Sequence, residues 1–358
     1  MSLHKSHSFF IISFILFSIL FESRVVKAQL PDVHTVFVKR IFHNGEHNAF
    51  TDMIRFKGKY YLTFRSCPEG HGVSEKASVI VLSSTDADKW DMVYRFHVEG
   101  RDTRDPHFLI FKDKLFVYTG TWHAKRDKET GSFNMNKHLG YAVMTNDGQT
   151  WTDPIMLEGT YGHYIWRAAA LGDKAYLCGR RIPNFIELSD QSKKGPVIES
   201  VMLESDDGLI WKKRSLFQET HGDETAFLFE TNGHVTAVSR RGKDNAELCI
   251  SELPYTNWHR TDLGRYIGGP LLAKWGTRLI VGGRQRTDKG YVTTLYWLKD
   301  TQLHEFITFP SGGDNSYPGF VELNPREALV SYYSSHEKDE NGKSITAIYL
   351  AKIEIPEK

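Results

Sequence analysis

The stretch MIRFKGKYYLTFR, residues 53–65, is an apolar run, a tight polar turn around Gly58 and a second apolar run. The same kind of hairpin recurs at 108–120, 168–180, 227–240, 271–283 and 320–333. The turns follow one another at intervals of 43 to 60 residues. Repeats of this period are typical of stacked or radial architectures, so we take the hairpin as the unit of the fold.

A second repeated motif follows the hairpins, a turn of the form Ser/Thr-x-Asp-Gly-x-x-Trp. Copies lie at 84–90, 145–151 and 205–211, and a degenerate copy runs from 251 to 258. Ser, Thr and Asp side chains hydrogen-bond nearby backbone groups, glycine adopts positive φ, and Trp buries a large ring. We interpret these turns as structural, because each copy has too few oxygen ligands for calcium.

Each unit therefore reads as four short antiparallel strands, and the chain is expected to be an all-β, six-bladed β-propeller. The last hairpin is followed by only one further strand, at 346–355. We expect the stretch 33–42 to supply the missing strand and close the ring. No stretch has the periodicity of a long amphipathic helix.

The N-terminus has the features of a secretory signal over residues 1–28. Lys5 precedes the apolar run 9–21, and Ala28 ends a small-residue cleavage site. Residues 29–358 are then expected to form one secreted or periplasmic domain, with no stable membrane insertion after cleavage. A net charge of +1 argues against nucleic acid or an anionic membrane as partner.

Cysteine and histidine spacing gives no sign of a metal or cofactor. Cys67, Cys178 and Cys249 are odd in number and fall inside expected strands, so we interpret them as buried thiols. No His/Cys/Asp spacing resembles a zinc site, and no glycine-rich phosphate loop is present. We therefore expect neither a metal nor a cofactor.

Arginines recur at equivalent places in the repeat. Counting from the hairpin turns, four second strands end in arginine, and Arg104 opens the second blade; the set is Arg65, Arg104, Arg180, Arg240 and Arg284. A propeller brings equivalent positions to one end of its axis. We therefore expect a positively charged bowl that binds a carboxylate, phosphate or sulfate group.

Glu224 and Tyr317 occupy the same repeat position two blades apart. A phenol with its free pKa of about 10 is a poor nucleophile, but an adjacent carboxylate can act as its base. Tyrosine nucleophiles are known among glycoside hydrolases. The pair thus predicts a catalytic nucleophile, Tyr317, with Glu224 as its activating base.

The Asp turns, the hairpin Glu224–Arg240 and Tyr317 followed by PGFVEL resemble the sialidase (neuraminidase) superfamily, over nearly the whole mature chain. The resemblance implies a propeller with Asp-box (BNR) repeats. It also implies that Tyr317 is the nucleophile, Glu224 its partner, and Arg240 and Arg284 (or Arg286) members of an arginine triad.

The chain departs from that family at two places. The Arg-Ile-Pro motif of the first blade is replaced by His47–Asp52, and Arg65, Arg104 or Arg180 would have to compensate. The loop after the first hairpin, 68–75, has no Asp for the acid/base role, so we expect His71 or Glu69 to transfer the proton. Further candidates for substrate contact open the first and third blades: Asn48, Asp52 and Trp166, the last as a platform for a sugar ring.

The leading hypothesis is a secreted exo-acting glycoside hydrolase that removes a terminal, acidic sugar from a glycan. Two alternatives remain open: a polysaccharide lyase acting on uronates, and a carbohydrate-binding propeller without catalysis. The sequence does not identify the sugar or its linkage.

Overall fold

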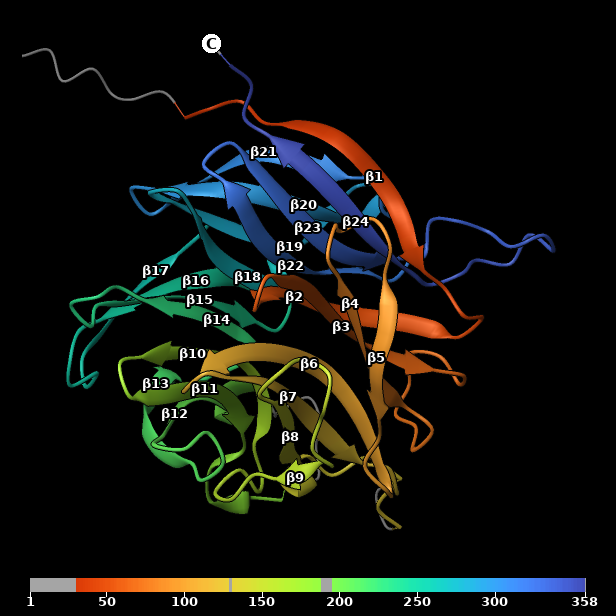
Figure 1. Cartoon of the computed structure of the whole chain (residues 1–358). Helices are drawn as coiled ribbons and strands as arrows, with labels where there is room; N and C mark the ends of the chain where they lie inside the picture. Colours follow the sequence, from red (N-terminus) through yellow and green to blue (C-terminus); the bar gives the residue numbers. More distant parts are fainter. Residues whose placement is uncertain (1–29, 129–130, 188–194, 358) are drawn as a thin grey trace, which may run out of the picture. The chain divides into compact units, whose positions relative to one another are not determined.

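The computed structural model describes residues 30–128, 131–187 and 195–357, and these form an all-β propeller of six four-stranded antiparallel blades (Figure 1). The predicted signal segment, 1–28, lies outside the described residues. Among the described residues the only helical elements are three single 3₁₀ turns, at Met135–Lys137, Pro183–Phe185 and Gly195–Val197. None of the helices found there is long and apolar enough to span a bilayer.

The blades follow the chain in order. Blade 1 is β2 (His47–Phe56), β3 (Lys59–Cys67), β4 (Ser78–Ser84) and β5 (Asp91–Phe96), and blade 2 is β6 (Arg101–Phe111), β7 (Lys114–His123), β8 (Leu139–Thr145) and β9 (Ile155–Met156). Blade 3 is β10 (Tyr164–Leu171), β11 (Lys174–Arg181), β12 (Glu199–Ser205) and β13 (Lys212–Gln218). Blade 4 is β14 (Thr225–Phe229), β15 (Val235–Arg241), β16 (Asp244–Ser251) and β17 (Trp258–Asp262).

Blade 5 comprises β18 (Gly268–Trp275), β19 (Arg278–Thr287), β20 (Gly290–Lys299) and β21 (Gln302–Phe309). Blade 6 joins the two ends of the fold, because β22 (Asn315–Asn324), β23 (Glu327–Ser334) and β24 (Ala347–Glu354) are completed by β1 (His34–Phe42). Strand β1 pairs antiparallel with β24, for example at Val38 and Ala351. The predicted six blades and the predicted closure of the ring are therefore both confirmed.

The Asp turns connect neighbouring blades. In the turn after β8, Asp147 Oδ1 accepts hydrogen bonds from the backbone N–H groups of Gln149 and Thr150, both at 2.8 Å. The Gly148 carbonyl accepts a bond from the Tyr61 hydroxyl of the preceding blade at 3.4 Å. Gly208 and Tyr118 repeat this contact one blade on, at 3.0 Å. The turns thus have the structural role that their sequence predicted.

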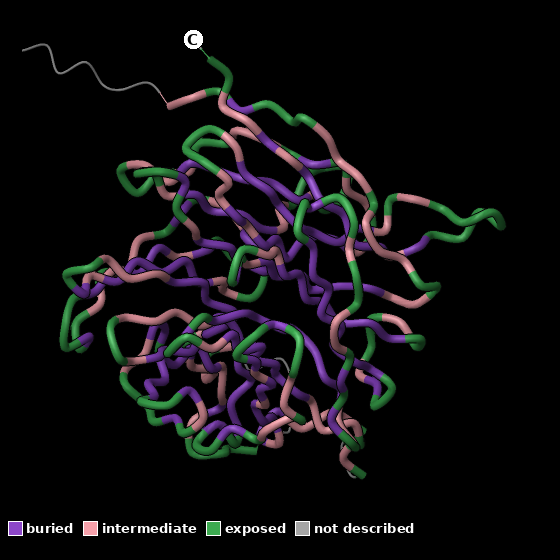
Figure 2. Tube along the Cα trace, viewed as in Figure 1, coloured by how far each residue is buried: buried purple, intermediate pink, exposed green. Residues whose placement is uncertain are grey.

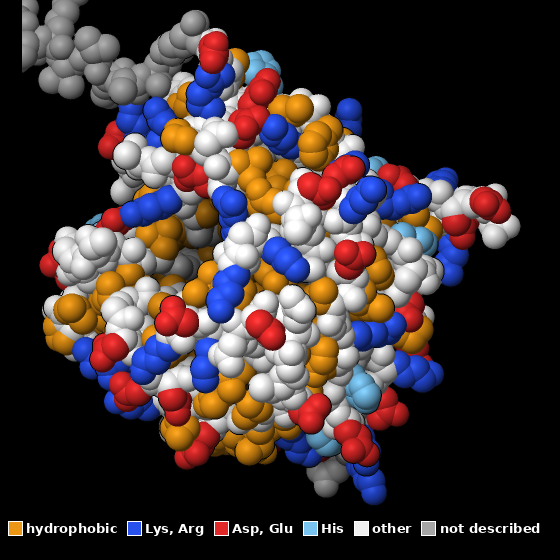
Figure 3. All heavy atoms as spheres, viewed as in Figure 1, with side chains coloured by type: hydrophobic (Ala, Val, Ile, Leu, Met, Phe, Trp, Pro, Cys, Tyr) orange, Lys and Arg blue, Asp and Glu red, His pale blue; other side chains and the backbone are white. Residues whose placement is uncertain are grey.

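Burial is concentrated in the strands, and exposed residues cluster in the connecting turns (Figure 2). Apolar side chains of adjacent blades form the core, as where Phe116 and Tyr118 of blade 2 pack with Leu177 and Trp211 of blade 3. Cys67, Cys178 and Cys249 are buried free thiols, as predicted. On the face seen in Figure 3, acidic and basic side chains are interspersed without a large area of one sign.

One buried ion pair ties the inner strands together across the propeller. Arg167 on β10 binds Asp52 on β2 at 3.1 Å. The same guanidinium donates to the carbonyl of Pro270 on β18 at 2.9 Å and to that of Pro318 on β22 at 2.8 Å. Four of the six blades therefore meet at this one side chain.

Candidate functional site

Tyr317 and Glu224 lie side by side at the start of the inner strands of blades 6 and 4. The Tyr317 hydroxyl donates a 2.7 Å hydrogen bond to Glu224 Oε1. Glu224 Oε2 accepts from Arg240 at 3.0 Å and from the backbone N–H of Gly269 at 3.1 Å. Both side chains are buried, with 6% and 7% exposure. The pair predicted from repeat counting is therefore within hydrogen-bond reach.

A recurrent bulge in the inner strand orients Tyr317 and its counterparts in the other blades, except in blade 4, which carries Glu224 and has no bulge. The ladder between the first and second strands shifts register in five blades, and four of the bulged residues have left-handed backbones: Phe50, Asp105, Gly269 and Tyr317. A bulge re-orients a side chain that regular pleating would direct elsewhere. Repeat counting selected Ala49 and Arg104 for this position in blades 1 and 2. In the structure the residues that follow them, Phe50 and Asp105, occupy the bulge. The spacing of the turns does not reveal the bulges, so the count was one residue short.

The electrostatics of the pair keep the phenol protonated at rest. Burial, followed by the charge of Glu224, raises the pKa of Tyr317 well above its ordinary value, and Arg240 and Arg284 oppose the shift. A phenol in this environment does not ionise by itself near neutral pH, so it needs the adjacent carboxylate as a base.

Three arginines from adjacent blades flank the pair. Arg180 binds Asp223 at 2.6 Å, and Arg240 lies between Asp223, at 3.3 Å, and Glu224. The Arg284 guanidinium lies 5.5 Å from the centre of the Tyr317 ring. The side chains of these arginines keep 19%, 21% and 16% exposure, so each reaches solvent.

Each of these guanidinium groups already has a carboxylate partner. Arg284 pairs with Asp314 at 2.9 Å, as Arg180 and Arg240 do with Asp223 and Glu224. Carboxylates therefore balance much of the positive charge that was expected of this bowl. One terminal nitrogen of each arginine still has no hydrogen-bond partner within the described ranges, and these three groups remain as donors for an anion.

Arg65 and Arg104, predicted to bind substrate, instead hold the loop that follows β3. Arg65 is fully buried and binds both oxygens of Asp102, at 3.0 and 3.1 Å. It also donates to the carbonyls of Gly70 and Gly72. Arg104 binds Asp102 as well, and reaches the His71 carbonyl at 3.1 Å. The two arginines thus fix the backbone on either side of His71.

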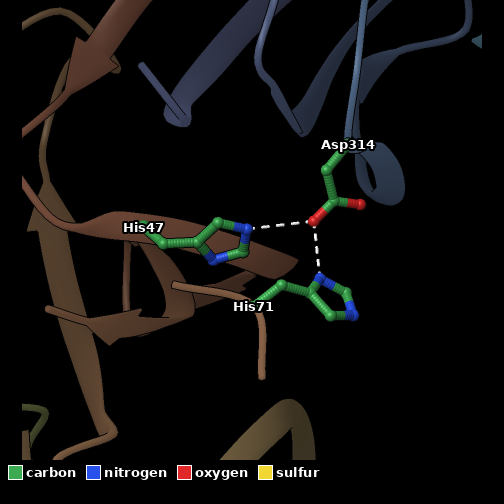
Figure 4. A group of neighbouring side chains, drawn as sticks. All are labelled: His47, His71 and Asp314. Atoms are coloured by element: carbon green, nitrogen blue, oxygen red, sulfur yellow. Dashed lines mark hydrogen bonds and ion pairs between the residues drawn. The ribbon is translucent and has the colours of Figure 1, made fainter. Parts of the chain in front are cut away.

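His71 belongs to a cluster with His47 and Asp314, which come from three separate segments (Figure 4). Asp314 Oδ2 lies 3.0 Å from His47 Nε2 and 2.6 Å from His71 Nδ1. One nitrogen or oxygen atom of each residue lies within 4.8 Å of the other two. The cluster thus combines two imidazoles with a carboxylate, groups that also bind divalent cations. The cluster adjoins the Tyr317–Glu224 pair, because the Phe50 ring contacts those of both His71 and Tyr317.

Asp105, at the bulge of β6, is a buried carboxyl with an altered acidity. Burial raises its pKa to about 6, although the charge of Arg104 and the hydroxyl of Tyr164 oppose the shift. Tyr164 donates a hydrogen bond to one of its oxygens, and the other has no partner among the residues that the structure describes. Asp105 therefore keeps its proton to a higher pH than an ordinary carboxyl group.

No protein-family model matches the chain, and no curated protein matches its sequence. Solved structures do match. A protein of unknown function from Dyadobacter fermentans DSM 18053 superposes with a TM-score of 0.73 at 20% identity, over 91% of this chain and 100% of that chain. Phage phi92 endosialidase has a TM-score of 0.62 at 10% identity, over 94% and 72%. Trypanosoma rangeli sialidase in complex with the inhibitor DANA has a TM-score of 0.64 at 12% identity, over 90% and 60%.

The fold is one that this chain shares with sialidases. At such low identity the likeness concerns the fold alone. The chain also corresponds to only 60% of the length of the Trypanosoma rangeli sialidase. Which chemistry the site performs must be argued from its own residues.

Four further predicted contacts are not placed to meet a ligand as expected. Trp166 is 1% exposed and packs edge-on against His107 and Tyr317, so neither face of its indole is free for a sugar. Asn48 and Asp52 are buried, and both are hydrogen-bonded to neighbouring segments of the backbone. Asp52 also forms an ion pair with Arg167.

Glu69 is exposed and bound to Lys76 at 2.5 Å and to Ser74 at 2.7 Å. Of the two predicted acids, His71 is the one next to Tyr317 and Glu224.

Sequence reasoning missed Asp314, His47, Asp223 and Gly269. Asp223 and Asp314 each lie just ahead of an inner strand, and this shared place was a usable signal. Gly269 was also detectable, because Asp105, Gly269 and Tyr317 all precede a proline at the bulge. The partnership of His47 with His71 had no sequence signal, since both depend on a carboxylate from the other end of the chain.

Proposed function

We propose that this protein is a glycoside hydrolase that removes a terminal, acidic sugar from a glycan, with Tyr317 as nucleophile and Glu224 as its base. The observation that carries the proposal is the 2.7 Å hydrogen bond between the Tyr317 hydroxyl and Glu224. The shared fold of sialidases is in keeping with it.

In the first step, Tyr317 Oη attacks the anomeric carbon, its proton passes to Glu224, and the bond to the leaving oxygen breaks. A proton donor on the other side of the sugar protonates that oxygen. In the second step, water attacks the anomeric carbon, the bond to Tyr317 breaks, and Glu224 returns the proton to the phenolate. A phenol nucleophile is neutral before attack, which avoids repulsion from an anionic substrate.

The unpartnered terminal nitrogens of Arg180, Arg240 and Arg284 are the groups that would bind the acidic substituent. Guanidinium groups recognise planar carboxylates through paired hydrogen bonds. The internal carboxylates that hold these arginines leave little surplus positive charge. We therefore expect binding to depend on hydrogen-bond geometry more than on long-range attraction. Following the sequence of residues 1–28, we place the enzyme outside the cytoplasm.

The test is a screen of aryl glycosides of acidic and neutral sugars, followed by natural glycans. On a substrate that is turned over, Tyr317→Phe and Glu224→Gln are expected to lower kcat by about 10³-fold or more. The first variant lacks the attacking hydroxyl, and the second lacks the base that accepts its proton. Tyr332→Phe is the matched control, since Tyr332 is an equally buried phenol that donates to the Pro310 carbonyl instead.

Full activity of Tyr317→Phe would rule out the mechanism. A product with a new carbon–carbon double bond, detected by its ultraviolet absorbance, would identify a uronate lyase instead. Glycan binding by calorimetry without turnover of any substrate would identify a binding propeller.

A further inference from the structure

Asp314 connects the catalytic pair to two histidines. It lies just ahead of β22, three residues before Tyr317. Its Oδ2 faces His47 on β2 and His71 on the loop after β3 (Figure 4). Its Oδ1 accepts from Arg284 and from the Tyr333 hydroxyl, both at 2.9 Å. Four donors from four segments therefore fix one carboxylate.

This carboxylate is held in its charged form. Burial alone would raise the pKa of Asp314, but the hydrogen bonds from His47 and His71 and the charge of Arg284 outweigh burial, so that its pKa is well below the ordinary value. A fixed, ionised carboxylate bound to an imidazole N–H selects the tautomer of the ring and stabilises the imidazolium.

The two histidines are not equivalent. His47 has an 11% exposed side chain, and burial lowers its pKa, although its hydrogen bond with Asp314 opposes the shift. The side chain of His71 is 54% exposed. Its Nδ1 faces Asp314, and its Nε2 points away from the carboxylate (Figure 4). His71 is thus the ring that is placed to exchange a proton with a ligand.

The distances within this cluster fit hydrogen bonds better than coordination of a zinc ion. Zinc lies about 2.0–2.2 Å from its nitrogen and oxygen ligands, so two ligands at tetrahedral angles are about 3.4 Å apart. The observed separations of 2.6 and 3.0 Å are those of hydrogen bonds. A metal-bound His47 would also need an acceptor for Nδ1–H, and this buried atom has none among the described residues.

We propose that Asp314 is a positioning residue that makes His71 the proton donor to the leaving oxygen. The proposal rests on the hydrolase function proposed above. His71 Nε2–H gives its proton to the oxygen as the glycosidic bond breaks, and Asp314 stabilises the imidazolium before transfer. In the second step His71 Nε2 takes a proton from the attacking water, which restores the imidazolium.

The backbone around His71 is held in place for this role, because Arg65 and Arg104 bind the carbonyls on either side of it. Five charged or titratable side chains face His71 and Asp314 from the neighbouring elements: His47, Arg65, Arg104, Arg284 and Tyr333. Asp314 is the only carboxylate bonded to the His71 ring within the described part of the chain.

The test compares leaving groups in the wild type, His71→Asn and Asp314→Asn. A nitrophenolate leaves without protonation, whereas an alkoxide does not, so only the second needs an acid. We expect His71→Asn to lower kcat about 10²-fold or more on an alkyl or natural glycoside, and less than about 5-fold on the nitrophenyl glycoside. Asp314→Asn should show the same selective loss.

The control is His304→Asn on the outer strand β21, which is exposed and should change neither rate. Equal losses on both substrates in Asp314→Asn would reduce Asp314 to a structural role and overturn the proposal. So would one equivalent of bound metal in the purified protein together with loss of activity on chelation. If no substrate is found, NMR of the His71 imidazole still decides, since the signal of an Nδ1–H bonded to a carboxylate should move upfield in Asp314→Asn. An unchanged signal would refute the dyad, whatever the reaction.

Discussion

Gly269 lies against the face of the Tyr317 ring. A Cβ at this position would be 2.5 Å from Tyr317 Cδ2, and the residue has a left-handed backbone with φ of +59°. Gly269→Ala should therefore displace the ring from Glu224. We expect kcat to fall at least about 10-fold, with a stability loss of about 1–3 kcal/mol from overpacking. Steady-state kinetics and thermal unfolding measure the two effects.

Gly276→Ala is the matched control for this variant. Gly276 has nearly the same φ, +60°, but nothing lies within 4 Å of a Cβ placed there. It shares the backbone strain and lacks the contact with Tyr317. Equal losses of kcat in both variants would show that strain, and not displacement of the phenol, is responsible.

Arg167 should be important for stability and not for ligand contact. Arg167→Met leaves the charge of Asp52 buried and unpaired, and we expect a loss of about 3–5 kcal/mol in the free energy of unfolding. Asp52→Asn in the same chain should restore part of it. Arg326→Met, which breaks an exposed pair with Glu357, should have no measurable effect in the same denaturant titration. An unchanged free energy of unfolding in Arg167→Met would contradict the view that this residue stabilises the contact between four blades.

Asp105 should make stability depend on pH in the opposite sense to most carboxylates. Its folded pKa of about 6 lies above its ordinary value of 3.8. The folded state therefore binds more protons between these values, and stability falls as the pH rises from about 4 to 6. Asp105→Asn removes this loss, so it should be more stable than the wild type above pH 6, by up to about 3 kcal/mol. Below pH 4 the two should unfold alike in calorimetry, and a difference that does not vary with pH would disprove the assignment.

Arg180 should distinguish acidic from neutral substrates. Arg180→Gln removes one of the three available guanidinium groups and keeps a hydrogen-bonding side chain. We expect KM to rise about 10-fold for an acidic glycoside, because a hydrogen bond to a charged group contributes about 1.5–3 kcal/mol. The KM of the matching neutral glycoside should hardly change. A similar rise for both substrates would indicate a general disturbance of Asp223, the partner of Arg180.

The repeats predicted the fold because blade formation is local. Residues 53–65 and their five relatives encode hairpins through alternating burial and turn chemistry, and Asp147 and Asp207 form their turns with backbone groups two and three residues away. Counting along these repeats also paired Glu224 with Tyr317, because a radial fold brings equivalent positions together. It failed for Arg65 and Trp166, whose surroundings belong to other blades.

Sequence alone thus determined the number of blades, the closing strand and the pairing of Glu224 with Tyr317, since each of these follows from contacts within one repeat or from the symmetry of the repeats. Only the tertiary structure decided how the charges are matched, which bulged residues face the site, and that Asp314 joins His47 to His71. The arginine–carboxylate pairs join side chains 16 to 43 residues apart, and Asp314 lies 243 residues from His71 and 267 from His47. No local pattern of amino acids reports such distances.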